Sequence, residues 1–108
     1  MMASSKEYLD YVLEQLSPLP DVSSRPMMGE YVLYCAGRVV GGIYDDRFLL
    51  KPVPEAADMM KEAGRELRLE LPYPGAKEML VPDVDDSELC CRMVRVIAEK
   101  LPPPKKRR

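Results

Sequence analysis

Few side chains in this sequence of 108 residues have the types and spacing that chemistry requires. Histidine, the usual general base near neutral pH and the commonest transition-metal ligand, is absent, although Asp, Glu, Lys and Cys could still act in catalysis. The three cysteines, Cys35, Cys90 and Cys91, are odd in number and form no C-x-x-C pair, so they predict neither a disulfide framework nor a zinc site. We therefore expect a protein that is not an enzyme and that uses no cofactor and no metal.

Cys90 and Cys91 are neighbours in a predicted helix. Their Cβ directions then diverge by about 100°, so a disulfide between them cannot form without distortion. Cys90 falls on the apolar face of that helix, where a thiol acts as a small hydrophobic group. We expect Cys90 to fill the core; a redox switch is the alternative.

Three basic residues in predicted strands are candidate contacts for an anion or an acidic partner: Arg25, Arg47 and Lys51. If their strands share one sheet, the three side chains could lie on one face and form a basic cluster. The alternative is that they form surface ion pairs with Glu30, Asp45 and Asp46, which contribute little energy.

Other residue clusters favour structural roles. Gly29, Gly41 and Gly42 lack the spacing of a phosphate-binding loop, so we expect bulges or close backbone approach. An acidic run lacks the ligand spacing and central glycine of a calcium loop, and helix capping by two of its members is the preferred interpretation. The run comprises Asp83, Asp85, Asp86 and Glu88, with Asp85 and Glu88 as the capping pair. The methionine pairs 27–28 and 59–60 either fill the core, which we expect, or mark an adaptable partner surface.

The charge of the chain is unevenly distributed. The formal net charge is -2, yet residues 105–108 are all basic; without them 12 basic residues stand against 18 acidic ones, a charge of -6. The acidic body should repel nucleic acid, whereas Lys105, Lys106, Arg107 and Arg108 could contact phosphates weakly and without sequence selectivity. The alternative is a solvated tail.

Three features favour the cytoplasm as the location of this chain. No apolar run approaches the ~20 residues that span a bilayer. Residues 1–8 lack the basic-then-apolar pattern of a secretion signal. Unpaired cysteines fit a reducing compartment.

Hydrophobic periodicity predicts a helix, four strands, a helix, one or two strands and a final helix. The first helix should begin at Ser4, with Glu7 completing a capping box, and should bury Leu13 and Leu16. The final helix, which ends before Pro102, should bury Val94 and Ile97. The predicted strands are 23–28, 30–35, 39–44 and 47–51, then 67–71 and 79–81; the middle helix begins at Pro54 and is capped by Gly64.

Short turns at Gly37-Arg38 and Asp45-Asp46 indicate an antiparallel meander, in which Pro26 places its strand at an edge. The predicted fold class is therefore α+β: an antiparallel sheet, with a four-strand meander and one or two further strands, packed against helices. We expect residues 4–101 to form a single domain and residues 102–108 to form a disordered proline-rich and basic tail.

Three segments carry a resemblance to a known family. Residues 25–31, Arg-Pro-Met-Met-Gly-Glu-Tyr, are similar to its Arg-x-Met-x-Gly signature. Residues 41–51, Gly-Gly-Ile-Tyr-Asp-Asp-Arg-Phe-Leu-Leu-Lys, follow at the expected distance, and residues 73–77 with Met79 resemble a later segment. Together they resemble the N-terminal domain of the TfoX/Sxy competence regulators. The resemblance implies a secretion-chaperone-like α+β sandwich and a role in competence gene expression.

These observations lead to one functional hypothesis and two alternatives. The leading hypothesis is a non-enzymatic interaction module of the TfoX N-terminal type, which contacts a protein partner in transcriptional regulation. The first alternative is a weak nucleic-acid binder that uses residues 105–108. The second is a domain that binds a small anionic ligand through Arg25 and Lys51.

Overall fold

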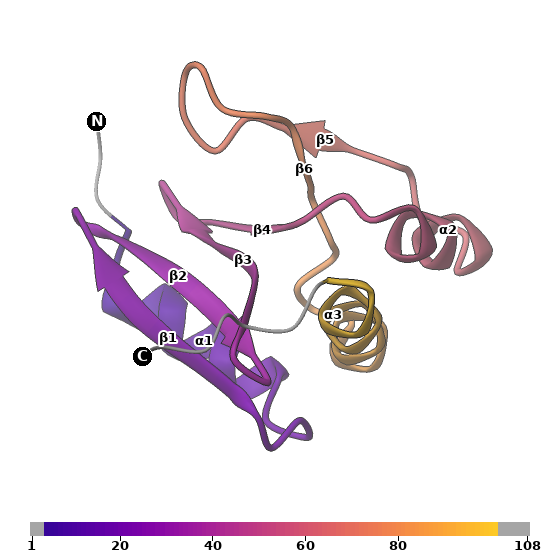
Figure 1. Cartoon of the computed structure of the whole chain (residues 1–108), viewed down its shortest axis with the longest axis horizontal. Helices are drawn as coiled ribbons and strands as arrows, with labels where there is room; N and C mark the ends of the chain where they lie inside the picture. The colour runs from indigo at the N-terminus through magenta and orange to yellow at the C-terminus, as the bar shows by residue number, and fades with distance from the viewer. Residues whose placement is uncertain (1–3, 102–108) are drawn as a thin grey trace, which may run out of the picture.

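The computed structural model describes residues 4–101. In it, three helices are interspersed along the chain with the strands of one antiparallel sheet (Figure 1). The helices are α1 (Lys6–Gln15), α2 (Pro54–Glu62) and α3 (Ser87–Lys100). The strands are β1 (Val22–Met27), β2 (Glu30–Cys35), β3 (Arg38–Tyr44), β4 (Arg47–Leu50), β5 (Leu69–Glu70) and β6 (Met79–Leu80). They form one sheet in the order β1-β2-β3-β4-β6-β5, so the predicted α+β class and four-strand meander are confirmed.

The turns of the meander use left-handed backbone. Asp45 and Asp46 both have φ 55°, as the sequence predicts for this tight turn. The turn between β2 and β3 lies at Ala36 and Gly37 rather than at Gly37-Arg38, with φ values of 53° and 80°. Two successive positive φ angles match the twist of a hairpin, so Ala36 accepts this conformation and Arg38 becomes the first residue of β3.

The two edges of the sheet differ in how they are protected. β1 forms one edge, as predicted from Pro26, which cannot donate a ladder hydrogen bond. β5 forms the other edge, and it is shorter than the predicted strand 67–71. The rest of that segment has no ladder partner on β6 beyond the bond from the Val81 amide to the Arg68 carbonyl.

Two helix caps are displaced by one residue from their predicted positions. Ser5, not Ser4, caps α1 by accepting the Tyr8 amide, because the Ser4 hydroxyl bonds to another part of the chain. Asp86, not Asp85, caps α3 by accepting the Leu89 amide. In both cases the neighbouring polar residue is engaged in a tertiary contact that the local pattern does not reveal.

Helix α2 ends just before Gly64, as predicted from the sequence. Gly64 has φ 76° and follows the C-cap, and the next amide, from Arg65, donates to the Met60 carbonyl at 2.9 Å.

Within residues 4–101, no helix has both the length and the apolar character needed to cross a membrane.

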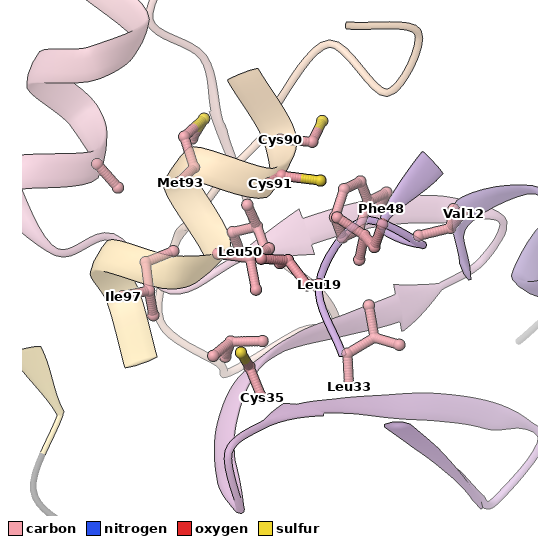
Figure 2. Packing of buried hydrophobic residues seen from close by; sticks show 14 of the residues in the cluster. Val12, Leu19, Leu33, Cys35, Phe48, Leu50, Cys90, Cys91, Met93 and Ile97 are labelled. Atoms are coloured by element: carbon pink, nitrogen blue, oxygen red, sulfur yellow. The ribbon is translucent and has the colours of Figure 1, made fainter. Parts of the chain in front are cut away.

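All three helices pack on one face of the sheet. Register places Ile43, Phe48 and Leu50 on that face, and all belong to one buried cluster with side chains of α1, α2 and α3 (Figure 2). Leu16, Val94 and Ile97 are fully buried as predicted, whereas Leu13 is half-buried at the margin. We call the opposite side, which no helix covers, the open face. It carries residues such as Val32, Tyr44, Arg47, Leu49 and Glu70.

Candidate functional site

Three segments that are distant in sequence meet at one end of the open face. They are the β1–β2 turn, the β3–β4 turn and residues 71–74, and Figure 1 shows these turns at the same end of the sheet. Each belongs to, or directly adjoins, one of the segments that carry the family resemblance. The fold therefore brings the family pattern together in space.

An apolar groove lies between the β1–β2 turn and residues 71–74. It encloses about 430 Å³ and is lined by Met27, Met28, Glu30, Tyr44, Pro72, Tyr73 and Pro74; we call it the Met/Tyr groove. Met28 is 96% exposed and Tyr73 is 49% exposed, although both are large apolar side chains. Such exposure in one place is typical of a binding surface rather than of scattered surface residues.

Arg47 fixes one wall of the groove. Its Nη1 donates to the Glu70 carboxylate at 2.8 Å and to the Leu71 carbonyl at 3.1 Å, and its Nη2 donates to the Pro72 carbonyl at 3.2 Å. Its Nε donates to the carbonyl of Tyr44 at 3.1 Å. One guanidinium thus ties the segment that follows β5 to the β3–β4 turn, because its planar donors reach several acceptors at once.

Glu30 holds in place the opposite wall of the groove, at the β1–β2 turn. It is 8% exposed, and its Oε1 accepts the Ser4 hydroxyl at 2.5 Å and the Asp45 amide at 3.1 Å. The Ser4 oxygen in turn accepts the Asp46 amide at 3.0 Å, and the Ser4 amide donates to the Gly29 carbonyl at 3.0 Å. The segment before α1 therefore joins the two hairpin turns beside the groove.

Two tyrosines form the floor and the rim. Their ring centroids, from Tyr44 and Tyr73, lie 6.2 Å apart with the planes inclined by 58°. The Tyr44 ring lies against Gly42, where a Cβ would come within 2.6 Å of Cε2. Burial, followed by Tyr73 and Glu30, raises the pKa of the Tyr44 hydroxyl. Tyr44 therefore stays neutral at pH 7 and offers a hydroxyl rather than a charge.

The chemistry of the groove suits recognition rather than catalysis. Its walls are thioether, aromatic and proline surfaces, and its charged lining group is the Glu30 carboxylate. Methionine packs against ligands of irregular shape, and tyrosine gives large contact area at low entropic cost. The groove therefore suits an apolar side chain of a protein segment, with a nearby basic or hydrogen-bond-donating group.

The predicted basic residues do not meet at one ligand-sized site. Arg25 on β1 and Arg47 on β4 share the open face but are separated by β2 and β3. The Arg25 guanidinium lies over the Tyr34 ring at 6.0 Å from its centroid, and Lys51 is half-buried just after β4. The surface pairing expected with Glu30, Asp45 and Asp46 is wrong for Arg47, which bonds instead to Glu70 of β5, on the far side of β6 in the sheet.

The methionine pairs divide between the two interpretations. Met60 is fully buried in the core and Met59 is half-buried, as core filling predicts. Met27 and Met28 are exposed beside the groove, so core filling is wrong for this pair. Sequence reasoning did not identify Tyr44 and Tyr73 as site residues; their presence in two segments of the family pattern was the available signal.

The remaining candidates are structural among the described residues. Gly41 and Gly42 permit close backbone approach, as predicted. Arg65 pairs with Asp83 at 3.2 Å and Asp86 at 2.8 Å. Burial raises the pKa of the Cys90 thiol to about 12. In residues 4–101, no three Cys, Asp or Glu side chains are placed to hold a metal ion.

Cys90 is buried as predicted, and Cys91, which was not assigned to the core, is buried as well. The predicted nucleic-acid contacts, Lys105, Lys106, Arg107 and Arg108, lie outside the described residues, as does the predicted tail 102–108.

Comparison with known proteins assigns the chain to a family. The sequence pattern of the TfoX N-terminal domain matches residues 14–97, which include all three segments that meet at the groove. An "Uncharacterized 12.7 kDa protein in trpE 5'region" of Spirochaeta aurantia is 38% identical over 113 aligned positions, which cover 99% of this chain and 91% of that protein. The chain therefore belongs to the TfoX N-terminal domain family.

Proposed function

We propose that this chain is a regulatory protein-interaction module that contacts a protein partner through the Met/Tyr groove and thereby influences transcription of competence genes. TfoX N-terminal domains are competence-related regulatory domains, which supports the regulatory part of the proposal.

One observation supports the contact surface above all others. Met28 occupies the tip of the β1–β2 turn with φ 54°, in left-handed backbone that a methionine rarely adopts, and its side chain is almost wholly in water. Strained backbone and an exposed large apolar side chain both cost stability, so their combination favours a functional origin. Beside Met28, Tyr73 and two prolines complete a concave apolar surface.

A capture experiment with matched variants tests this proposal. The full chain, the double variant Met28→Ser/Tyr73→Ser and the control Tyr11→Ser are immobilised, and bound proteins from native lysate are quantified. Tyr11 is a suitable control because it is an exposed tyrosine on α1, outside the groove lining. We expect a partner that the wild type and the control bind equally, and whose purified form binds the groove variant at least about tenfold more weakly.

Two results would contradict the proposal at different points. Equal capture of every partner by the groove variant would show that the Met/Tyr groove is not the contact surface. A specific partner combined with unchanged competence transcripts on deletion of the gene would reject the transcriptional role and leave the interaction role in place.

Direct nucleic-acid binding is the second candidate function. The observation that favours it is the run of four basic residues at 105–108. The remainder of the chain carries a formal charge of -6, so it supplies no broad positive surface to assist these residues. We therefore propose at most weak and salt-sensitive contact with phosphates.

A further inference from the structure

Three leucines alternate along the edge segment that contains β5, one within the strand and one on either side of it. Leu67, Leu69 and Leu71 are between 39% and 46% exposed. Leu69 is paired with Leu80, whose side chain is in the core, so Leu69 points to the helix side of the sheet. Leu67 and Leu71 flank it at alternate positions and are exposed to a similar degree. Such a stripe at an edge strand is an unprotected site for pairing with another strand.

The backbone of β5 is arranged for such pairing. The Val81 amide donates to the Arg68 carbonyl at 3.0 Å, so Arg68 and Val81 form a hydrogen-bonded pair of the antiparallel ladder. Ladder pairs alternate, hence Leu69 and Leu80 form a non-hydrogen-bonded pair. The amide and carbonyl of Leu69 therefore point away from β6, toward the open edge.

We propose that two copies of this chain pair antiparallel through their β5 edges, about a twofold axis at Leu69. In this register Leu69 faces Leu69 of the second copy, and Leu67 faces Leu71. The pairing extends the six-stranded sheet continuously from one copy into the other. This inference is independent of the Met/Tyr groove.

Charge selects this register over its neighbours. With the axis at Leu69, Arg68 faces Glu70 of the second copy, and each partner also retains its own Arg68–Glu70 bond at 2.9 Å. An axis at Arg68 would oppose two arginines and place Glu66 opposite Glu70. An axis at Glu70 would oppose two glutamates. Opposite charges across a strand pair stabilise it and like charges destabilise it.

The backbone bonds available at the edge agree with the same register. Leu69, whose amide and carbonyl face the edge, can exchange two hydrogen bonds with its copy. The Leu71 carbonyl is already an acceptor for Arg47 at 3.1 Å, so the pairing ends there. Two intermolecular backbone bonds and six leucines make a small interface, so we expect the dimer to form only as protein concentration rises.

The geometry also explains why the assembly would stop at two copies. Pairing consumes both β5 edges, and the edges that remain are the two β1 strands. Pro26 lies in β1 and cannot donate to a further strand. A twofold interface that leaves only protected edges is closed, so it forms dimers rather than fibres.

Sedimentation across a range of protein concentrations tests the proposal with the full chain. The wild type should shift from monomer mass to dimer mass as concentration rises. Leu69→Lys, which opposes two ammonium groups at the axis, should raise the dissociation constant by about tenfold or more. Tyr11→Lys places the same charge on α1 and should leave self-association unchanged. A wild type that stays monomeric, or a Leu69→Lys variant that dimerises normally, would overturn the proposal.

Single cysteine variants test the register. At a hydrogen-bonded pair the Cα atoms lie about 5.5 Å apart, within the range that a disulfide requires, so Leu69→Cys should cross-link to its copy under mild oxidation. Arg68→Cys should not cross-link, because in this register position 68 faces position 70 of the second copy. The two cysteines would then be two residues apart along the paired strands. The native cysteines are buried and give little background. Preferential cross-linking through position 68 would refute the register, as would the absence of cross-linking at position 69.

Discussion

The guanidinium of Arg47 on β4 and the carboxylate of Glu70 on β5 lie 2.8 Å apart and close the wall of the Met/Tyr groove. This hydrogen bond is the main cause of the lowered pKa of Glu70; burial opposes it, and the charge of Arg47 adds to it. The pair matters for the groove because the same guanidinium holds the carbonyls of Leu71 and Pro72.

Arg47→Ala should release residues 71–74 and lower the free energy of unfolding by about 1–3 kcal/mol, because several hydrogen bonds are lost together. Arg47→Lys should recover little of this stability, since a single ammonium cannot reach all the acceptors. Arg68→Ala, which removes a more exposed bond to the same carboxylate, is the control and should cost less than about 1 kcal/mol. Urea unfolding measures the stability of all three variants. Full recovery of stability with lysine would contradict the role of the planar guanidinium.

Asp86 should contribute to the pH dependence of stability. The hydrogen bond from Arg65, followed by that from the Leu89 amide, lowers its pKa in the folded chain. A lowered folded-state pKa gives stability that is present above the unfolded pKa of about 3.9 and is lost as pH falls through the folded value. At pH 7, Asp86→Ala should cost about 1 kcal/mol through loss of the cap.

Asp86→Asn separates the charge from the cap, because the amide oxygen can still accept the Leu89 amide. The stability difference between wild type and Asp86→Asn should therefore be largest near pH 7 and shrink below pH 4. Urea unfolding at several pH values measures this difference. A difference that does not change between pH 7 and pH 2 would rule out the charge contribution.

The local sequence pattern predicts the meander correctly. It does not predict which side chains form contacts with residues distant in sequence. Asp45 and Asp46 form the predicted turn because both tolerate positive φ. Ser4 looks like a helix cap in sequence, yet its hydroxyl bonds to Glu30, which is 26 positions away. No periodicity reports such a contact, so the cap passes to Ser5.

The glycines in β3 provide a test of close packing. A Cβ on Gly41 would lie 2.1 Å from the Leu49 carbonyl oxygen, and backbone cannot move aside without breaking the β3–β4 ladder. Gly41→Ala should therefore cost about 2–4 kcal/mol. The control is Gly75→Ala, where φ is 88° but no atom lies within 4 Å, so backbone strain alone should cost about 1 kcal/mol. Equal thermal shifts for the two variants would contradict the packing argument.

The cysteines should be unreactive in the folded protein. Burial, followed by the Asp86 charge, raises the pKa of Cys90 to about 12, and burial is also the main cause of the raised pKa values of Cys35 and Cys91. Because the thiolate is the reactive form, a thiol reagent at pH 8 should label the native chain slowly. Labelling in guanidinium should reach all three thiols at once. One thiol that reacts rapidly in the native protein would favour the redox alternative.

The candidate site was only partly accessible from sequence. Its charge makes Arg47 a candidate in the sequence, but its partners Glu70 and Pro72 lie 23 and 25 positions away, and only the fold shows that its donors are occupied. The sequence allows Met28 either in the core, which it favours, or on a partner surface. Its exposure follows from the tip position of the β1–β2 turn, which depends on the register of that hairpin.

Duplex DNA provides the test that separates the two candidate functions. If the chain is a protein-interaction module, its affinity for DNA at physiological salt should be no tighter than the nonspecific range of about 10⁻⁴ to 10⁻⁶ M. The charge of -6 outside residues 105–108 leaves those residues as the source of any binding. Fluorescence anisotropy with labelled duplexes should therefore show binding that weakens steeply as salt rises.

Variants of the last seven residues complete that test. Deletion of residues 102–108 should abolish DNA binding and preserve thermal stability, because the deletion lies beyond α3, which ends at Lys100. Replacement of residues 105–108 with glutamine should have the same effect at unchanged length, whereas replacement of residues 102–104 with serine should leave binding intact, since charge rather than proline supplies the contact. Nanomolar, sequence-selective binding that survives the deletion would reject the interaction-module proposal. The next residues to neutralise would then be the basic residues in or next to the strands of the sheet: Arg25, Arg47 and Lys51.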